Sequence, residues 1–158
     1  MAFKSRGVRA LVQLQMLELK KSFAAWRKAK RLGVELPASR DSAYKDLGTL
    51  GRHPLRASRG YLVWLCEVQG RRVPVVPEPP EPADVARYGA AYLETLEAAW
   101  LAHAAWMTDR ALYSKKVHHT RWGHPITIEG MLEHAVAHPM RHRFQLEELT
   151  ALVPRKRR

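Results

Sequence analysis

Hydrophobic residues recur at intervals of three and four along four segments of the chain, which is the period of an amphipathic helix. The first segment covers residues 6–32 and ends at Gly33, a typical C-terminal cap. Its apolar stripe consists of Val8, Val12, Met16, Leu19, Phe23 and Trp26. No segment shows the strict alternation that predicts a half-buried strand. The pattern therefore predicts an all-α protein.

The second predicted helix covers residues 49–69 and is followed by residues 71–82, which contain five prolines. Such a segment favours an extended, polyproline-like strap that reaches about 37 Å at ~3.1 Å per residue. The preceding helix is shorter, about 30 Å at ~1.5 Å per residue. A strap of this length can cross the whole molecule, so the second and third helices are expected to run parallel. The result is a four-helix bundle in up-down-down-up order with a Pro-rich crossover between helices two and three.

The third predicted helix begins near Asp84 and ends at about Leu112, and a loop rich in lysine and histidine follows it. Thr127 is expected to cap the fourth helix, which ends at about Val153, before Pro154. Its inward stripe is Ile128, Met131, Ala135, His138, His142, Gln145, Leu149 and Val153. Two histidines and a glutamine thus interrupt an otherwise apolar face, and a buried imidazole needs a hydrogen-bond partner or a metal.

His138 and His142 are four positions apart, which places both imidazoles on one helix face with Cβ atoms about 5–6 Å apart. Both can bind one ion at about 2.0–2.1 Å. The spacing alone leaves open that they are neutral core histidines bonded to one another, because eight histidines in 158 residues produce such pairs by chance. A third histidine on the core stripe of another helix, His53, favours the metal. We therefore predict a divalent-metal site formed by His53, His138 and His142.

The other histidines are weaker candidates. His103 is the main competitor of His53, and His134 lies about 12 Å along the axis from His142, so it is expected at the rim of the site. The loop histidines are expected in solvent: His118, His119 and His124. Cys66, about 20 Å from His53 on the same helix, is interpreted as a small buried hydrophobe.

Prolines and polar residues next to the predicted ligands are expected to affect the geometry of the site. Pro54 and Pro139 directly follow two predicted ligands, and each is expected to bend its helix, Pro54 from within the first turns. Gln145 and Arg143 are expected to orient the ligands or a substrate anion. Three neutral imidazoles with an open fourth position form a catalytic rather than a structural ligand set, suited to hydrolysis or thiol transfer.

The run His134-Ala-Val-Ala-His138-Pro-Met-Arg-His142-Arg-Phe-Gln-Leu resembles the last-helix motif of the DinB/YfiT-like superfamily, in which a histidine and three residues precede His-Arg-Gly-Gln. The segment Leu50-Gly-Arg-His53-Pro-Leu-Arg-Ala-Ser-Arg-Gly-Tyr-Leu-Val-Trp-Leu is similar to the family's second helix, where the first metal-binding histidine precedes an aromatic-rich stretch. Phe144 stands where the motif usually has glycine, and Pro139 is a second departure.

The resemblance implies an up-down-down-up four-helix bundle, often dimeric, with a three-histidine site for zinc or nickel. It carries His53, His138 and His142 over as the ligands. Characterised members of the family include thiol-dependent transferases and isomerases that use low-molecular-weight thiols, so a thiol cosubstrate and a small-molecule substrate are implied with the fold.

Charge provides an alternative function. The net charge is +12, and basic residues gather at 155–158 and on the polar side of the first helix, at Arg9, Lys20, Lys21, Arg27, Lys28, Lys30 and Arg31. Such residues can bind phosphates, which allows a basic nucleic-acid-binding module. A solvated basic face is favoured instead, because the sequence has no zinc-finger spacing, RNP-like motif or short helix-turn-helix.

The length fits one domain, a DinB-like bundle over residues 1–153 followed by a basic tail over 154–158. One cysteine excludes an intrachain disulfide, and neither a signal peptide nor a membrane-length apolar run is present, so a cytoplasmic protein without a membrane partner is expected. The leading hypothesis is a homodimeric metal-dependent enzyme, a thiol-dependent transferase or hydrolase. The alternatives are the nucleic-acid-binding module and a bundle whose metal only stabilises the fold.

Overall fold

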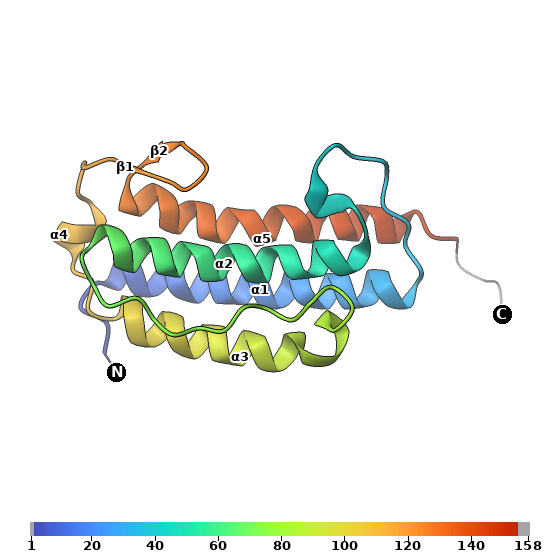
Figure 1. Ribbon diagram of the computed structural model, residues 1–158, viewed down its shortest axis with the longest axis horizontal. Coiled ribbons are helices and arrows are strands. Elements are labelled where there is room, and N and C mark those ends of the chain that lie inside the picture. The colour runs from blue at the N-terminus through green and yellow to red at the C-terminus, as the bar shows by residue number, and fades with distance from the viewer. Residues whose placement is uncertain (1, 155–158) are drawn as a thin grey trace.

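The computed structural model describes residues 2–154, which are predominantly helical. Four long helices lie side by side (Figure 1): α1 (Arg6–Arg31), α2 (Leu47–Val68), α3 (Val85–Ala104) and α5 (Ile128–Ala151). The connections contain the 3-10 helix η1 (Ser42–Tyr44), the short α4 (Asp109–Leu112) and the strands β1 (His118–His119) and β2 (Pro125–Ile126). The strands form a two-residue antiparallel hairpin. The prediction of an all-α protein is confirmed, with this hairpin as a small addition.

The directions of the long helices follow from their connections, and α2 and α3 run the same way because the long strap joins them (Figure 1). In Figure 1, α1 and α5 run from left to right, whereas α2 and α3 run from right to left. The most extensive helix contacts join α1 to α5, which are the first and last helices in the sequence. Within residues 2–154, no helix is both long and apolar enough to span a membrane. The predicted basic tail, apart from Pro154, falls outside the described residues.

Residues 71–82 form the extended strap that the prolines predict, and they cross the molecule between the end of α2 and the start of α3 (Figure 1). The strap is held mainly through its backbone carbonyls. Arg52 donates to the carbonyls of Pro79 and Pro80, Arg59 to that of Val76, and the Tyr92 hydroxyl to that of Pro77. Because Arg52 and Arg59 belong to α2 and Tyr92 to α3, the strap fastens both helices.

Side-chain caps set the helix boundaries. Thr127 caps α5 as predicted, accepting a hydrogen bond from the amide of Gly130, and Gly33 ends α1 with a positive φ of 65°. The third predicted helix is too long, since α3 ends at Ala104. Thr108 adopts extended backbone and its hydroxyl accepts from the amide of Ala111, so a new short helix, α4, begins there.

Asp46 caps α2 and starts that helix two residues earlier than predicted. Pro54 therefore lies about two turns after the start of α2 at Leu47, and it removes the helical hydrogen bond to the carbonyl of Leu50. Pro139 is internal to α5, as predicted. Each proline directly follows a predicted ligand.

The core between the helices is mostly apolar but contains a polar cluster around Ser58. Ser58 accepts hydrogen bonds from the side-chain amide of Gln15 at 2.8 Å and from the indole of Trp100 at 3.1 Å. At Gly51, a Cβ atom would lie 2.4 Å from the Trp26 ring. The indole of Trp26 in turn donates to the carbonyl of Leu47. Close contact of α1 with the start of α2 thus fixes the helix turn that carries His53.

Candidate metal centre

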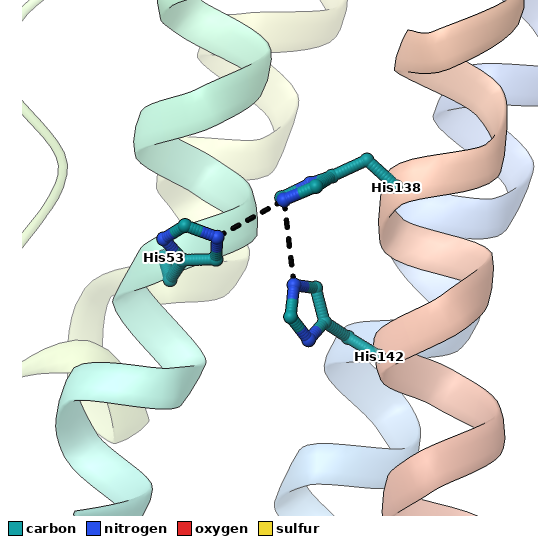
Figure 2. A group of neighbouring side chains, drawn as sticks. All are labelled: His53, His138 and His142. Atoms are coloured by element: carbon teal, nitrogen blue, oxygen red, sulfur yellow. Dashed lines mark hydrogen bonds between the residues drawn. The ribbon is translucent and has the colours of Figure 1, made fainter. Parts of the chain in front are cut away.

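The three predicted ligands meet between α2 and α5, as Figure 2 shows. Nε2 of His138 lies 3.0 Å from Nε2 of His53 and 3.3 Å from Nε2 of His142. All three potential ligand atoms lie within 4.8 Å of one another. His53 comes from α2, and the other two residues occupy successive turns of α5. The structure therefore brings together residues that are 85 positions apart in the sequence.

Burial keeps these imidazoles neutral. His138 and His142 are 7% and 1% exposed, while His53 is partly buried. Loss of hydration, followed by the neighbouring imidazoles and the Arg141 charge, lowers the pKa of His138 to about 2. Burial, with the charges of His53 and Arg141, lowers the pKa of His142 to about 4, and burial also lowers the pKa of His53. Neutral imidazole is the form that binds a metal.

Hydrogen bonds among the three rings cannot satisfy all of them. Each ring nitrogen carries either one proton or one lone pair, and Nε2 of His138 faces two other nitrogens. One hydrogen bond uses that atom and leaves the third nitrogen without a partner. Nδ1 of His138 is also buried without a hydrogen-bond partner among the described residues. A metal cation, unlike a hydrogen bond, can accept one lone pair from each of the three rings at once.

The distances suit such an ion. Two nitrogens bound to one metal at about 2.0–2.1 Å lie about 3 Å apart when the angle between the bonds is near tetrahedral or octahedral values. The separations of 3.0 and 3.3 Å match this spacing. The three ligand atoms lie within 4.8 Å of one another, so this neutral group could hold a divalent ion.

Tyr44 is a member of the site that the sequence did not reveal. It belongs to η1, in the connection between α1 and α2, and its hydroxyl lies 3.1 Å from Nδ1 of His142. The hydroxyl donates to Oε1 of Gln145, so its oxygen accepts the Nδ1 proton of His142. This leaves the lone pair of His142 on Nε2, directed at the site. The signal available in the sequence was weak: Tyr44 is the only aromatic residue between Gly33 and Leu47.

Gln145 thus acts through Tyr44, in agreement with its predicted orienting role, but the prediction for Arg143 is wrong. Arg143 is directed away from the histidines and pairs with Glu18 and Glu147. Helical phase explains the difference, since Arg141 is three positions after His138 and shares its face. Arg141 lines a cavity beside His138, and its charge lowers the pKa of all three predicted ligands.

This cavity has a volume of about 560 Å³ and reaches His53 and His138. Its wall is aromatic on one side, where the rings of Tyr61 and Trp122 lie 6.0 Å apart. Its charged lining residues are Asp41, Arg56, Arg59, Glu78, Arg121 and Arg141. A second hollow of about 380 Å³ shares His134, His138 and Arg141 and is also lined by Phe144. Small molecules can therefore reach the histidines.

The remaining histidines lie outside the three-residue cluster. His134 is exposed at the rim, as predicted, where its Nε2 lies 3.1 Å from the Tyr61 hydroxyl. His103, the expected competitor of His53, belongs to α3 and is not part of the cluster. His119 and His124 are exposed, whereas His118 is partly buried against the Trp64 ring, so its predicted full solvation is wrong. Cys66 is buried, as predicted.

No known protein family, curated protein or solved structure matches this chain.

Proposed function

We propose that this protein is a metal-dependent enzyme of the thiol-dependent transferase or hydrolase type, built as an up-down-down-up four-helix bundle of the DinB/YfiT-like kind. His53, His138 and His142 would hold a divalent ion, zinc or nickel. The observation that carries the proposal is the convergence of three neutral Nε2 atoms from two helices at separations of 3.0 and 3.3 Å.

The ligand set supports catalysis over a purely structural role. Structural zinc sites normally use four protein ligands, whereas catalytic sites use three and leave a position for water or substrate. Within residues 2–154, the candidate ligands form a group of three histidines beside an open cavity of about 560 Å³. When bound, the ion would lower the pKa of a bound water or hold a thiolate.

Residues around the three histidines orient the ligands, limit water on one side and leave an entrance on the other. Tyr44 and Gln145 hold His142 in the tautomer that presents Nε2 to the site. Buried apolar neighbours, among them Leu55 and Leu146, line a small gap next to His142 and limit water on the side facing the core. The cavity on the opposite side, next to His53 and His138, is where a substrate or a low-molecular-weight thiol would enter.

Elemental analysis after purification without chelators tests the proposal. The wild-type chain is expected to retain a single zinc or nickel ion per chain, and His142→Ala to lose most of it. His124→Ala, an exposed histidine in the hairpin loop, is the matched control and is expected to retain the metal. Equal metal content in wild type and His142→Ala would contradict the site.

The structural-metal alternative is separated by a second measurement. If the ion only stabilises the fold, chelation lowers the melting temperature strongly, and the loaded protein shows no turnover with any combination of low-molecular-weight thiol and electrophile or ester. If the proposal holds, a thiol-dependent or hydrolytic activity is lost on chelation and recovered with zinc or nickel.

A further inference from the structure

Two arginines flank the histidine cluster at equivalent places on facing helices. Arg56 follows His53 by three positions on α2, and Arg141 follows His138 by three positions on α5. Residues three apart share a helix face, so each guanidinium lies on the same side as a proposed ligand. Both arginines line the 560 Å³ cavity. Burial lowers the pKa of His53, the charge of Asp41 opposes this shift, and the charges of Arg141 and Arg56 add to it.

These two guanidinium groups are available to a ligand. Of the other arginines in the cavity wall, Arg59 pairs with Glu78 at 2.7 Å and Arg121 pairs with Glu67 at 2.7 Å. Across the described part of the chain, Arg56 and Arg141 form no ion pair, and both are exposed. Asp41 is the remaining carboxylate of the wall, and it caps η1 through the amide of Ala43. Positive charge therefore remains in excess beside the cluster.

The rest of the wall is aromatic. Tyr61 and Trp64 are buried beneath the cavity, and Trp122 is 49% exposed above them. The Trp122 ring lies 6.0 Å from that of Tyr61 and 6.1 Å from that of His134, so aromatic contacts on two sides position it. A half-exposed indole at the wall of a cavity can stack with an aromatic ligand.

A guanidinium binds a carboxylate through charge-assisted hydrogen bonds, often two in parallel, and aromatic side chains stack with planar rings. We propose that the substrate is a small aromatic carboxylate whose carboxylate group binds Arg56 and Arg141 and whose ring stacks on Trp122. Because the arginines lie beside His53 and His138, the bound molecule lies next to the histidine cluster. That this molecule is a substrate rests on the proposed function, but the arginine and tryptophan contacts form without the metal.

Calorimetric titration of the metal-free full chain tests this binding, with benzoate and cinnamate as probes and the corresponding neutral amides as controls. The acids are expected to bind at least about tenfold more tightly than the amides, since hydrogen bonds to charged groups are the stronger ones. Arg141→Gln and Arg56→Gln are each expected to weaken binding of the acids about tenfold and to leave binding of the amides unchanged. Arg9→Gln, an exposed arginine of α1, is the matched control.

The aromatic contact has its own readout. Trp122→Ala is expected to weaken benzoate and benzamide equally and to leave acetate unaffected. The inference would be overturned by any of three results: acids and amides bind equally, the arginine variants bind the acids like wild type, or neither acid shows saturable binding.

Zinc content measured on parallel samples separates this inference from the proposed function. Charge-selective binding in a chain that takes up no zinc would refute the metal enzyme and leave the carboxylate pocket standing. The opposite result would be acid binding only in the zinc-loaded protein, unchanged by substitution of Arg56 or Arg141. It would refute the carboxylate pocket, because the ion itself would then hold the carboxylate.

Discussion

The Tyr44 hydroxyl accepts a hydrogen bond from Nδ1 of His142 over 3.1 Å, and a single turn of 3-10 helix between α1 and α2 places it there. Groups that hold the second nitrogen of a ligating histidine fix its tautomer and orientation. The loop that precedes α2 therefore belongs to the site as much as the two helices that carry the histidines.

Tyr44→Phe is expected to lower zinc affinity about 10- to 100-fold, because the loss of such a partner typically has this effect. The variant keeps the aromatic ring, so the fold should be retained. Competition with a chromophoric zinc chelator measures the affinity. Tyr88→Phe, at a tyrosine that is 47% exposed, is the control and should bind zinc like wild type. Unchanged affinity in Tyr44→Phe would show that His142 needs no partner.

Acid should destabilise the metal-free protein through its buried histidines. The folded-state pKa values of His138, about 2, and His142, about 4, lie below the ordinary value of 6.5. Below pH 6.5 the unfolded chain therefore binds more protons than the folded chain, so the free energy of unfolding falls as the pH falls. Each such histidine changes the free energy of unfolding by up to about 1.4 kcal/mol per pH unit. This contribution fades above pH 6.5, where the imidazole is neutral in both states.

Urea unfolding between about pH 7 and pH 5 measures this slope above the range in which carboxylates such as Glu18 contribute, since the ordinary pKa of that side chain is 4.5. His138→Gln should flatten the dependence, whatever its effect on absolute stability. His124→Gln, at an exposed position, should leave the slope unchanged. A wild-type curve that is flat over this interval would contradict the predicted neutrality of the cluster.

Gly51→Ala is expected to destabilise the protein by about 1–3 kcal/mol, since overpacking of a tight contact has this effect. The added Cβ would lie 2.4 Å from the Trp26 ring, so α1 and α2 must separate near His53. Gly60→Ala on the same helix meets nothing within 4 Å and is expected to stabilise by about 0.5–1 kcal/mol. Thermal unfolding of the two variants therefore gives opposite signs, and equal shifts would show that the close approach does not matter.

Ser58→Ala should cost about 1–3 kcal/mol, because it leaves the buried donors of Gln15 and Trp100 without an acceptor. Chemical denaturation measures the loss. Adding Gln15→Leu to this variant should recover part of the stability, since it removes one of the two orphaned donors. A double variant less stable than Ser58→Ala would indicate that Gln15 acts through its shape instead.

Helical periodicity predicted the four long helices and the all-α class, and the density of prolines predicted the strap. Placement of polar residues on apolar stripes selected His53, His138 and His142, because a buried imidazole is unusual enough to stand out. Local competition was harder to predict. Thr108 ends the third helix by starting a new one, and Asp46 extends the second, in each case through one side-chain hydrogen bond to a nearby amide.

Contacts across the fold could not be predicted from spacing. Tyr44 contacts His142 although 98 positions separate them in the sequence, and the periodicity of neither segment predicts that contact. Arg143 and Arg141 differ by about half a helix turn, which is enough for one to pair with Glu18 on α1 and the other to line the cavity. The three-residue spacing from His138 assigns Arg141 to the histidine face, but the hydrophobic stripe alone does not make this distinction.

The way the strap is held affects how freely its sequence can change. Arg52, Arg59 and Tyr92 bind its carbonyl oxygens, which every amino acid supplies, and Glu78 and Glu81 add side-chain ion pairs with the two arginines. Side chains that point outward, such as Val75 at 93% exposure, contribute nothing to this attachment. Residue 75 is thus a natural position for a fluorophore or spin label that reports on α2 and α3 without disturbing them.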